Sequence, residues 1–244
     1  MLKPLILATV FCLGLVTADP EPKDDSLNHY VDLVLDNLQV LIIESGLDPI
    51  PLPNNTVSFS DVVLGVTWHG EAAVYDGWLL GLANIYRSDD ADFIHAPDGR
   101  VVGFASGMGI GNMEGHYKCL AKFMDLGPIA DITLKIKGIK IYFEATLDPS
   151  TCRFKASVME VLSIGHIGVD ISGLGLLNWI VELVSEMVIN TVRIFIKNTV
   201  EGIVQDMTNE ILSTIDLGVL GPILGCDMTK GSATESRGHY LQGH

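Results

Sequence analysis

The chain has 244 residues, of which 48% are hydrophobic and 18% are charged, and its formal net charge is −15. A chain this apolar can bury enough surface to offset the entropy lost on folding, which excludes an intrinsically disordered protein. The acidic balance repels phosphate groups, so we expect no nucleic-acid partner.

The first 18 residues have the organisation of a secretory signal peptide. Lys3 precedes an apolar run from Leu5 to Val16, and Val16 and Ala18 occupy the small-residue positions before a cleavage site. The run is shorter than the ~20 residues needed to span a bilayer. We therefore expect residues 1–18 to be removed and the mature protein to be secreted, with no stable membrane insertion.

An amphipathic helix is expected directly after this segment. Asp24, Asp25 and Ser26 offer side-chain oxygens that can cap a helix start. Apolar residues then recur at helical spacing, at Leu27, Tyr30, Val31, Val34, Leu35, Leu38 and Ile42. Gly46 supplies a helix end, and the proline-rich sequence of residues 48–53 cannot continue the helix.

From Thr56 to Ile171 the pattern changes to strands, with turn residues at Gly70, Asp76-Gly77, Asp98-Gly99, Gly127-Pro128 and Asp148-Pro149. Three stretches are clearest and should form an antiparallel meander: Gly115–Met124, Ile132–Leu147 and Cys152–Ile164.

In the middle stretch, the apolar positions change from even to odd numbers across Lys137 and Gly138. A regular strand cannot keep both sets on one face, so we predict a β-bulge there and a strongly curved sheet with an apolar concave face.

A long helix is predicted from Leu176 to Ile215, because this segment has no proline and one glycine, Gly202. A continuous helix of this size would be ~60 Å long. Polar residues occupy only a narrow line along it, and a helix apolar around most of its circumference must be enclosed by protein. The curved sheet is the element available to enclose it. Residues 226–244 are polar and rich in glycine and serine, and are expected to form a flexible tail after a single domain at 19–225.

Cysteines and a glycosylation sequence fit an extracellular protein. Cys119, Cys152 and Cys226 follow the signal segment, and an oxidising compartment favours one disulfide and one free thiol among them. The sequence leaves their pairing open. Asn54 begins the acceptor sequence Asn-Asn-Thr, and the proline-rich turn before it should make a sugar accessible there.

Motifs of catalysis and metal binding are missing from the sequence. The glycines at 107, 109 and 111 lie in strand-like sequence with no following helix, unlike a phosphate-binding loop. Ser106 and Ser172 lack the Gly-x-Ser-x-Gly context of a hydrolase nucleophile. The histidines have no ligand spacing. We therefore expect no enzymatic activity, no metal site and no cofactor.

The order of amphipathic helix, bent antiparallel sheet and long apolar helix is similar to the lipid-binding super-roll architecture. This architecture is shared by bactericidal/permeability-increasing proteins, insect juvenile-hormone-binding and takeout proteins, and group 7 mite allergens. The chain most resembles the group 7 allergen family, in the strand sequence Tyr117–Lys122 and in residues 161–212, which include the HIG of 166–168 and the SGLG of 172–175.

The resemblance implies one α+β super-roll domain, in which a highly curved antiparallel β-sheet wraps around the long C-terminal α-helix with the N-terminal amphipathic helix alongside. It also implies that a hydrophobic molecule or lipid is held between helix and sheet. Physical reasoning agrees in part, since a helix lying in a bent sheet leaves apolar gaps that stay dry and accept apolar guests.

The hypothesis is thus a secreted, non-enzymatic binding protein for a hydrophobic small molecule or lipid held in an apolar cavity. Candidate lining residues are Ile141, Phe143, Phe154 and Val158 from the sheet, and Trp179, Met187, Val188 and Phe195 from the helix. For each of them the alternative is ordinary core packing. Two other functions stay open. One is a defence protein with a filled core that binds microbial envelope components through its surface, and the other is an esterase with serine and histidine at a pocket mouth. The sequence does not decide the oligomeric state.

Overall fold

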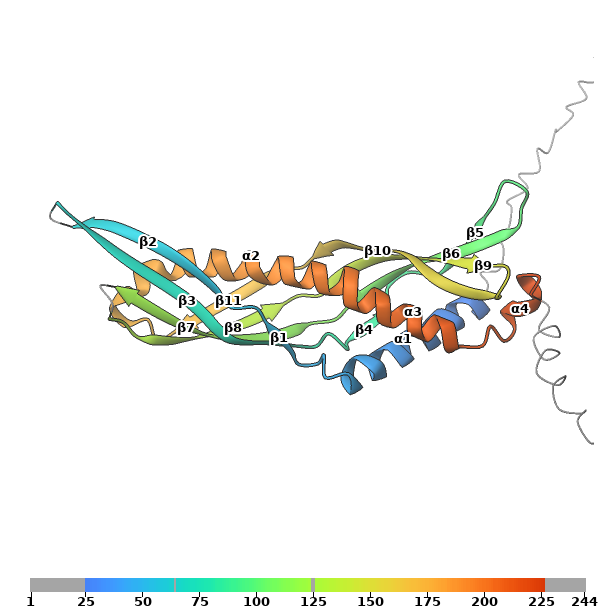
Figure 1. Ribbon diagram of the computed structural model, residues 1–244, viewed down its shortest axis with the longest axis horizontal. Coiled ribbons are helices and arrows are strands. Elements are labelled where there is room, and N and C mark those ends of the chain that lie inside the picture. The colour runs from blue at the N-terminus through green and yellow to red at the C-terminus, as the bar shows by residue number, and fades with distance from the viewer. Residues whose placement is uncertain (1–24, 64, 124–125, 227–244) are drawn as a thin grey trace, which may run out of the picture.

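The computed structural model describes residues 25–63, 65–123 and 126–226. The expected signal peptide and the expected tail after Cys226 lie outside these residues. The molecule is elongated, with two antiparallel sheets following one another along its length and a long C-terminal helical segment lying against both (Figure 1). The expected α+β super-roll, curved antiparallel strands around a long helix, is confirmed.

Sheet A occupies one end of the molecule. Its strands are β1 (Ile50–Leu52), β2 (Asn55–Val63), β3 (Val66–Leu80), β7 (Met113–Phe123), β8 (Ile129–Ile136) and β11 (Ile167–Ser172). Their order is β1-β3-β7-β8-β11, and β2 also pairs with β3.

Sheet B occupies the other end (Figure 1). Its strands are β4 (Ile85–Arg87), β5 (Asp92–His95), β6 (Val101–Ile110), β9 (Ile139–Asp148) and β10 (Arg153–Ile164). Their order is β10-β9-β6-β4, with β5 also paired to β6.

The predicted meander is wrong, because the stretch Ile132–Leu147 is two strands that belong to different sheets. β8 pairs with β7 in sheet A, and β9 pairs with β10 in sheet B. The change in apolar parity falls where the chain passes between the sheets at Gly138, whose φ is +67°. Gly138 accepts a hydrogen bond of 2.9 Å from Gly165, at the second passage between the sheets. The parity change therefore marks a crossing and not a bulge.

Two of the predicted turns lie inside strand β3. Gly70 packs under the ring of Phe59, and Gly77 packs against the ring of Tyr117, so a β-carbon at either position would overlap an aromatic ring. Asp76, with φ of +51°, lies in a bulge of β3 between Tyr75 and Trp78. These residues allow close ring packing and a bend within one long strand.

Helix α1 (Asp25–Glu44) buries the apolar stripe that its sequence predicted, from Leu27 to Ile42. Polar contacts fix it to sheet B. Arg87 donates two hydrogen bonds to the carboxylate of Asp32, at 2.8 and 3.1 Å. Gln39 donates one of 2.7 Å to the carbonyl oxygen of Ile85. The helix therefore covers the inner side of sheet B with a defined orientation.

The C-terminal helical segment is continuous over the predicted length. It comprises a 3₁₀ turn η1 (Gly175–Ile180), α2 (Val181–Thr199), a π-helical turn η2 (Val200–Val204) that contains Gly202, and α3 (Gln205–Thr214). A single stripe is buried: Val184, Val188, Val192, Ile196, Val200, Val204, Ile211 and Leu212. Ile194 is 63% exposed, so the expectation of a fully enclosed helix is wrong. Among the described residues, no helix is both long and apolar enough to cross a membrane.

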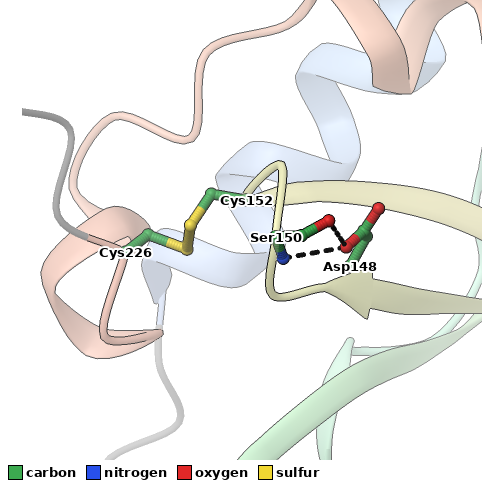
Figure 2. Close-up of a disulfide and its surroundings, with 4 residues drawn as sticks. All are labelled: Asp148, Ser150, Cys152 and Cys226. Atoms are coloured by element: carbon green, nitrogen blue, oxygen red, sulfur yellow. Dashed lines mark hydrogen bonds between the residues drawn. A yellow bond between two sulfur atoms is a disulfide. The ribbon is translucent and has the colours of Figure 1, made fainter. Parts of the chain in front are cut away.

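A disulfide attaches the end of the described chain to sheet B. After the short helix α4 (Leu220–Ile223), Cys226 is bonded to Cys152 in the β9–β10 turn, with 5.7 Å between their Cα atoms (Figure 2). In that turn, the backbone N–H and hydroxyl of Ser150 both donate to Asp148. Cys226, which the sequence placed in the tail, is buried. Cys119 is the buried free thiol, and burial raises its pKa to about 11.

Candidate binding site between the helix and the sheets

Polar side chains of the helical segment bind the edges of both sheets. In sheet A, Asn55 at the start of edge strand β2 donates a hydrogen bond of 2.7 Å to the hydroxyl of Thr191 in α2. In sheet B, the backbone N–H of Ala156 in edge strand β10 donates one of 2.8 Å to Asn209 in α3. The second bond satisfies a backbone N–H of an edge strand, and both bonds hold the helical segment to the sheet edges.

The space between these edges is lined almost entirely by apolar side chains. The buried stripe of α2 and α3 belongs to the same hydrophobic core as buried strand residues of both sheets, among them Val74, Tyr117, Leu134 and Phe143. Buried polar side chains within the described residues are limited to Ser106, Thr199 and Thr208. An interior of this kind can recognise a guest through burial of its apolar surface.

The candidate lining residues are placed as follows. Ile141, Phe143, Phe154 and Val188 are buried, and Met187 and Phe195 are half-buried. Val158 is half-buried because a bulge of β10 between Ala156 and Val158 moves Met159 to the inward position. Trp179 is 52% exposed. The structure therefore distributes these residues along the molecule and does not bring all of them to one place.

A closed cluster of aromatic rings lies between α1 and sheet B. It comprises Tyr30, Phe104, Phe143 and Phe154. The ring centres of Phe104 and Phe154 are 4.8 Å apart, and that of Tyr30 is 5.8 Å from Phe154 and 6.2 Å from Phe104. Edge-to-face contacts of this kind stabilise aromatic pairs beyond their buried area. Two of the predicted lining residues, Phe143 and Phe154, are thus members of this cluster.

The hydroxyl of Tyr30 is the unusual feature of the closed cluster. Tyr30 is 4% exposed, and among the described residues its hydroxyl is the buried side-chain polar atom for which no hydrogen-bond partner is present. Burial raises the pKa of Tyr30 to about 12. By contrast, the hydroxyl of buried Tyr117 donates a hydrogen bond of 2.8 Å to the carbonyl oxygen of Pro53.

Sequence reasoning placed Tyr30 in the buried stripe of the helix but gave it no functional role. The available signal was a phenol among aliphatic residues at a core position, since a buried tyrosine usually finds a partner for its hydroxyl.

An open cluster of aromatic rings lies at the sheet A end. It comprises Phe59 of β2, Phe123 of β7 and Trp179 of η1. Trp179 packs edge-to-face on Phe59 with 5.2 Å between ring centres, and lies 6.2 Å from Phe123. Half of the Trp179 surface remains in solvent. Trp179 is therefore at the opposite end of the roll from Phe143 and Phe154, which the single predicted cavity had combined.

A hollow of about 240 Å³ lies on sheet B, outside the helix–sheet interior. Ser88, Asp89, Asp92, Ser106, Lys140 and Tyr142 are among the residues that line it, and the lining includes no histidine. The hydroxyl of Ser106 donates to the backbone carbonyl of Asp89 at 3.3 Å. Ala105, Ile141 and Leu162 also line this hollow, so its lining is of mixed character, and it lacks the serine–histidine pair of an esterase.

The glycines of strand β6, part of which lines this hollow, leave room for side chains that pack directly on the strand. Gly107 lies under the carboxylate of Asp89, and a β-carbon on Gly109 would approach the Tyr86 ring to 2.6 Å. Within the described ranges, no group of three or more His, Cys, Asp or Glu side chains is arranged to hold a metal ion.

Comparison with known proteins gives the family of the chain. A crystal structure of lipopolysaccharide binding protein matches with a TM-score of 0.48 and 20% sequence identity, over 79% of this chain and 39% of that protein. The chain thus spans less than half the length of that protein. A comparison with curated proteins finds no match. The sequence profile of the group 7 allergens matches residues 26–212, which include α1, both sheets and most of the helical segment. The resemblance seen in the sequence is confirmed, and the chain belongs to the group 7 allergen family.

Proposed function

We propose that this protein is a secreted, non-enzymatic binding protein that holds a hydrophobic small molecule or lipid between its helical segment and its sheets. The observation that carries the proposal is the unpaired hydroxyl of Tyr30 inside the closed aromatic cluster. Leaving such a group buried without a partner costs about 1–3 kcal/mol. A guest that brings one polar atom into an otherwise apolar site would remove this cost.

The apolar surroundings of Tyr30 favour a guest with a hydrocarbon body. Each CH₂ group that moves from water into such a site contributes ~0.8 kcal/mol. Met159 lies opposite Phe143 in the β9–β10 pairing, and Met108 and Met207 are also buried. Methionine side chains adapt their shape readily, so the interior can rearrange around a chain or ring system.

The unpaired hydroxyl of Tyr30 favours a guest with an oxygen-bearing head group. After burial, the largest influences on the pKa of Tyr30 are Arg153, which lowers it, and Asp216, which raises it, so charges of both signs act on this hydroxyl. The guanidinium of Arg153 donates to the carbonyl oxygen of Ser213 at the end of α3. A carboxyl, hydroxyl or carbonyl group beside Tyr30 would accept its hydrogen bond. Fatty acids and long-chain alcohols have this composition.

Displacement of a fluorescent fatty-acid probe tests this arrangement in Tyr30→Phe. We expect the variant to bind a fatty acid about 5–10-fold more weakly, as for the loss of one hydrogen bond, and a plain hydrocarbon of equal length unchanged. Tyr117→Phe is the matched control, because it removes a buried hydroxyl that already has a protein partner. If Tyr30→Phe and the unaltered protein bind the fatty acid equally well, the hydroxyl of Tyr30 does not hold the head group.

The extracellular part of the proposal rests on the sequence and on Asn54. This residue is exposed between β1 and β2, where a sugar can be attached without disturbing either strand. We propose that it is glycosylated on the secretion route. Treatment of the secreted protein with a peptide N-glycosidase should reduce its mass, and Asn54→Gln should abolish that change. An unchanged mass in both would contradict glycosylation at Asn54.

A further inference from the structure

Four large apolar side chains are exposed at the sheet A end of the molecule. Their exposed fractions are 80% for Leu126, 60% for Ile129, 98% for Leu176 and 52% for Trp179. We call these four residues the apolar tip. Exposed apolar groups that gather in one place on a folded protein usually mark an interaction site.

Contacts between separate chain segments bring the apolar tip together. Phe123 is bridged to Leu126 by backbone hydrogen bonds, and its ring is 6.2 Å from that of Trp179. A β-carbon on Gly173, just before η1, would lie 3.2 Å from the carbonyl oxygen of Ile129. In Figure 1, the end of β7, the start of β8 and the start of the helical segment lie at the same end of the molecule.

Most residues in the segments that carry the apolar tip are uncharged. Residues 126–130 and 171–181 contain no Asp, Glu, Lys or Arg, although 18% of the whole chain is charged, and in the sequence Asp125 directly precedes Leu126. Charged residues of both signs lie on the neighbouring strands. Glu71 and Lys122 are opposite each other in the β3–β7 pairing, and Asp131 carries an exposed carboxylate on β8. The described residues at this end are therefore mainly apolar, with charges of both signs next to them.

We propose that the apolar tip docks the protein onto a neutral or zwitterionic lipid surface. Exposed apolar side chains at the end of an elongated molecule can enter a fluid lipid layer. Trp179 is half exposed and packs on Phe59 with its other side, and tryptophan is favoured at a lipid–water boundary. The mixed charges next to the tip match headgroups that carry both signs. The net charge of −15 disfavours an anionic surface.

Flotation with phosphatidylcholine vesicles tests the proposal. The double variant Leu126→Ser/Leu176→Ser should bind at least about 10-fold more weakly than the unaltered protein, because two leucines no longer leave water. The matched control is Val219→Ser/Ile223→Ser, which replaces side chains that are 70% and 51% exposed at the opposite end of the molecule. The control should bind as well as the unaltered protein. All replaced side chains are exposed, so equal melting temperatures are expected and are measured alongside.

Two further measurements separate insertion from attraction by charge. Brominated lipids should quench tryptophan emission, and this quenching should decrease in Trp179→Phe. Raising the salt concentration should leave binding to phosphatidylcholine unchanged, whereas replacing part of that lipid with phosphatidylserine should weaken it.

Several results would overturn the proposal. The first is no vesicle binding by the unaltered protein, and the second is equal binding by both double variants. The third is a dimer in solution that Leu126→Ser/Leu176→Ser converts to monomers while no form binds vesicles, since the tip would then contact a second copy. Fatty-acid probe binding should be the same in Leu126→Ser/Leu176→Ser and in the unaltered protein, so a failure of docking is distinguishable from a failure of the interior site.

Discussion

At the sheet B end the rings of Tyr30, Phe104 and Phe154 are buried, whereas at the sheet A end half of Trp179 remains in solvent. The strands and the helix are built alike at both ends, with apolar residues facing inward. The difference lies in what covers them. Helix α1 packs against β4 and α3, and the Cys152–Cys226 disulfide ties the chain beyond α3 to the β9–β10 turn. The segments added to the sheets, and not the sheets themselves, therefore decide which end is closed.

The largest difference in stability between the two ends should appear when one aromatic ring is removed from each. Phe104→Ala should lower the free energy of unfolding by about 3–5 kcal/mol, because it leaves a cavity in a fully buried site. Phe59→Ala, in the half-buried open cluster, should cost clearly less. Urea denaturation measures both. Equal losses would mean that the two ends are packed alike.

The disulfide should contribute the next largest effect. Cys152→Ser/Cys226→Ser should lose about 2–4 kcal/mol, since the bond closes a loop between residues 74 positions apart and so restricts the unfolded chain. Hydrogen exchange should increase most in α4 and in the β9–β10 turn, which the bond holds together, and less in β2 and β3, where it reflects only the lower global stability. An increase that is no larger in α4 and the β9–β10 turn than in β2 and β3 would contradict a local role for the bond.

Alkaline pH should lower the free energy of unfolding, because Tyr30 and Tyr117 are buried in the core. Burial raises the pKa values of Tyr30 and Tyr117 to about 12, from 10 in the unfolded chain. The folded state therefore keeps its phenol protons longer. Stability from this source is complete below pH 10 and is lost as pH rises from 10 to 12, by up to about 1.4 kcal/mol per pH unit for each tyrosine.

Unfolding followed at a series of alkaline pH values checks this effect. Tyr30→Phe and Tyr117→Phe should each reduce the slope of stability against pH. A slope that neither variant changes would show that other groups cause the loss.

The smallest effect is expected at the ion pair that orients α1. Arg87→Ala should cost about 1 kcal/mol, because its two hydrogen bonds to Asp32 are partly exposed and are screened by water. Hydrogen exchange in α1 should increase, and the effect of the substitution should shrink at high salt. A loss that does not depend on salt would indicate that the packing of the Arg87 stem, and not its charge, is what matters.

Local periodicity allowed parts of the fold to be predicted with accuracy. The whole buried stripe of α1, from Leu27 to Ile42, is read directly from helical spacing, because that spacing alone determines which face is apolar. The long helical segment follows for the same reason. The crossing at Gly138 could not be identified, since a bulge and a passage into a second sheet change strand parity in the same way. Only pairing with distant strands distinguishes them.

The candidate site was less predictable because it depends on how elements are placed relative to one another. The apolar character of Phe143, Phe154 and Trp179 was evident, but the sequence does not show that α1 covers the first two and leaves Trp179 open. The rings that enclose Tyr30 of α1 come from β6 and β10, which are far from α1 in the sequence. An unpaired hydroxyl of this kind can be identified only once the packing around it is known.

Native mass spectrometry can detect directly whether the interior holds a hydrophobic molecule. The protein is purified for this from the medium of cells that secrete it. Protein that carries a hydrophobic molecule in its interior should show a bound mass in a one-to-one ratio, and organic extraction should recover that molecule. Repeated recovery of the bare protein mass, together with no displacement of a fatty-acid probe, would contradict the claim. That result would favour a protein with a filled core that acts through its surface.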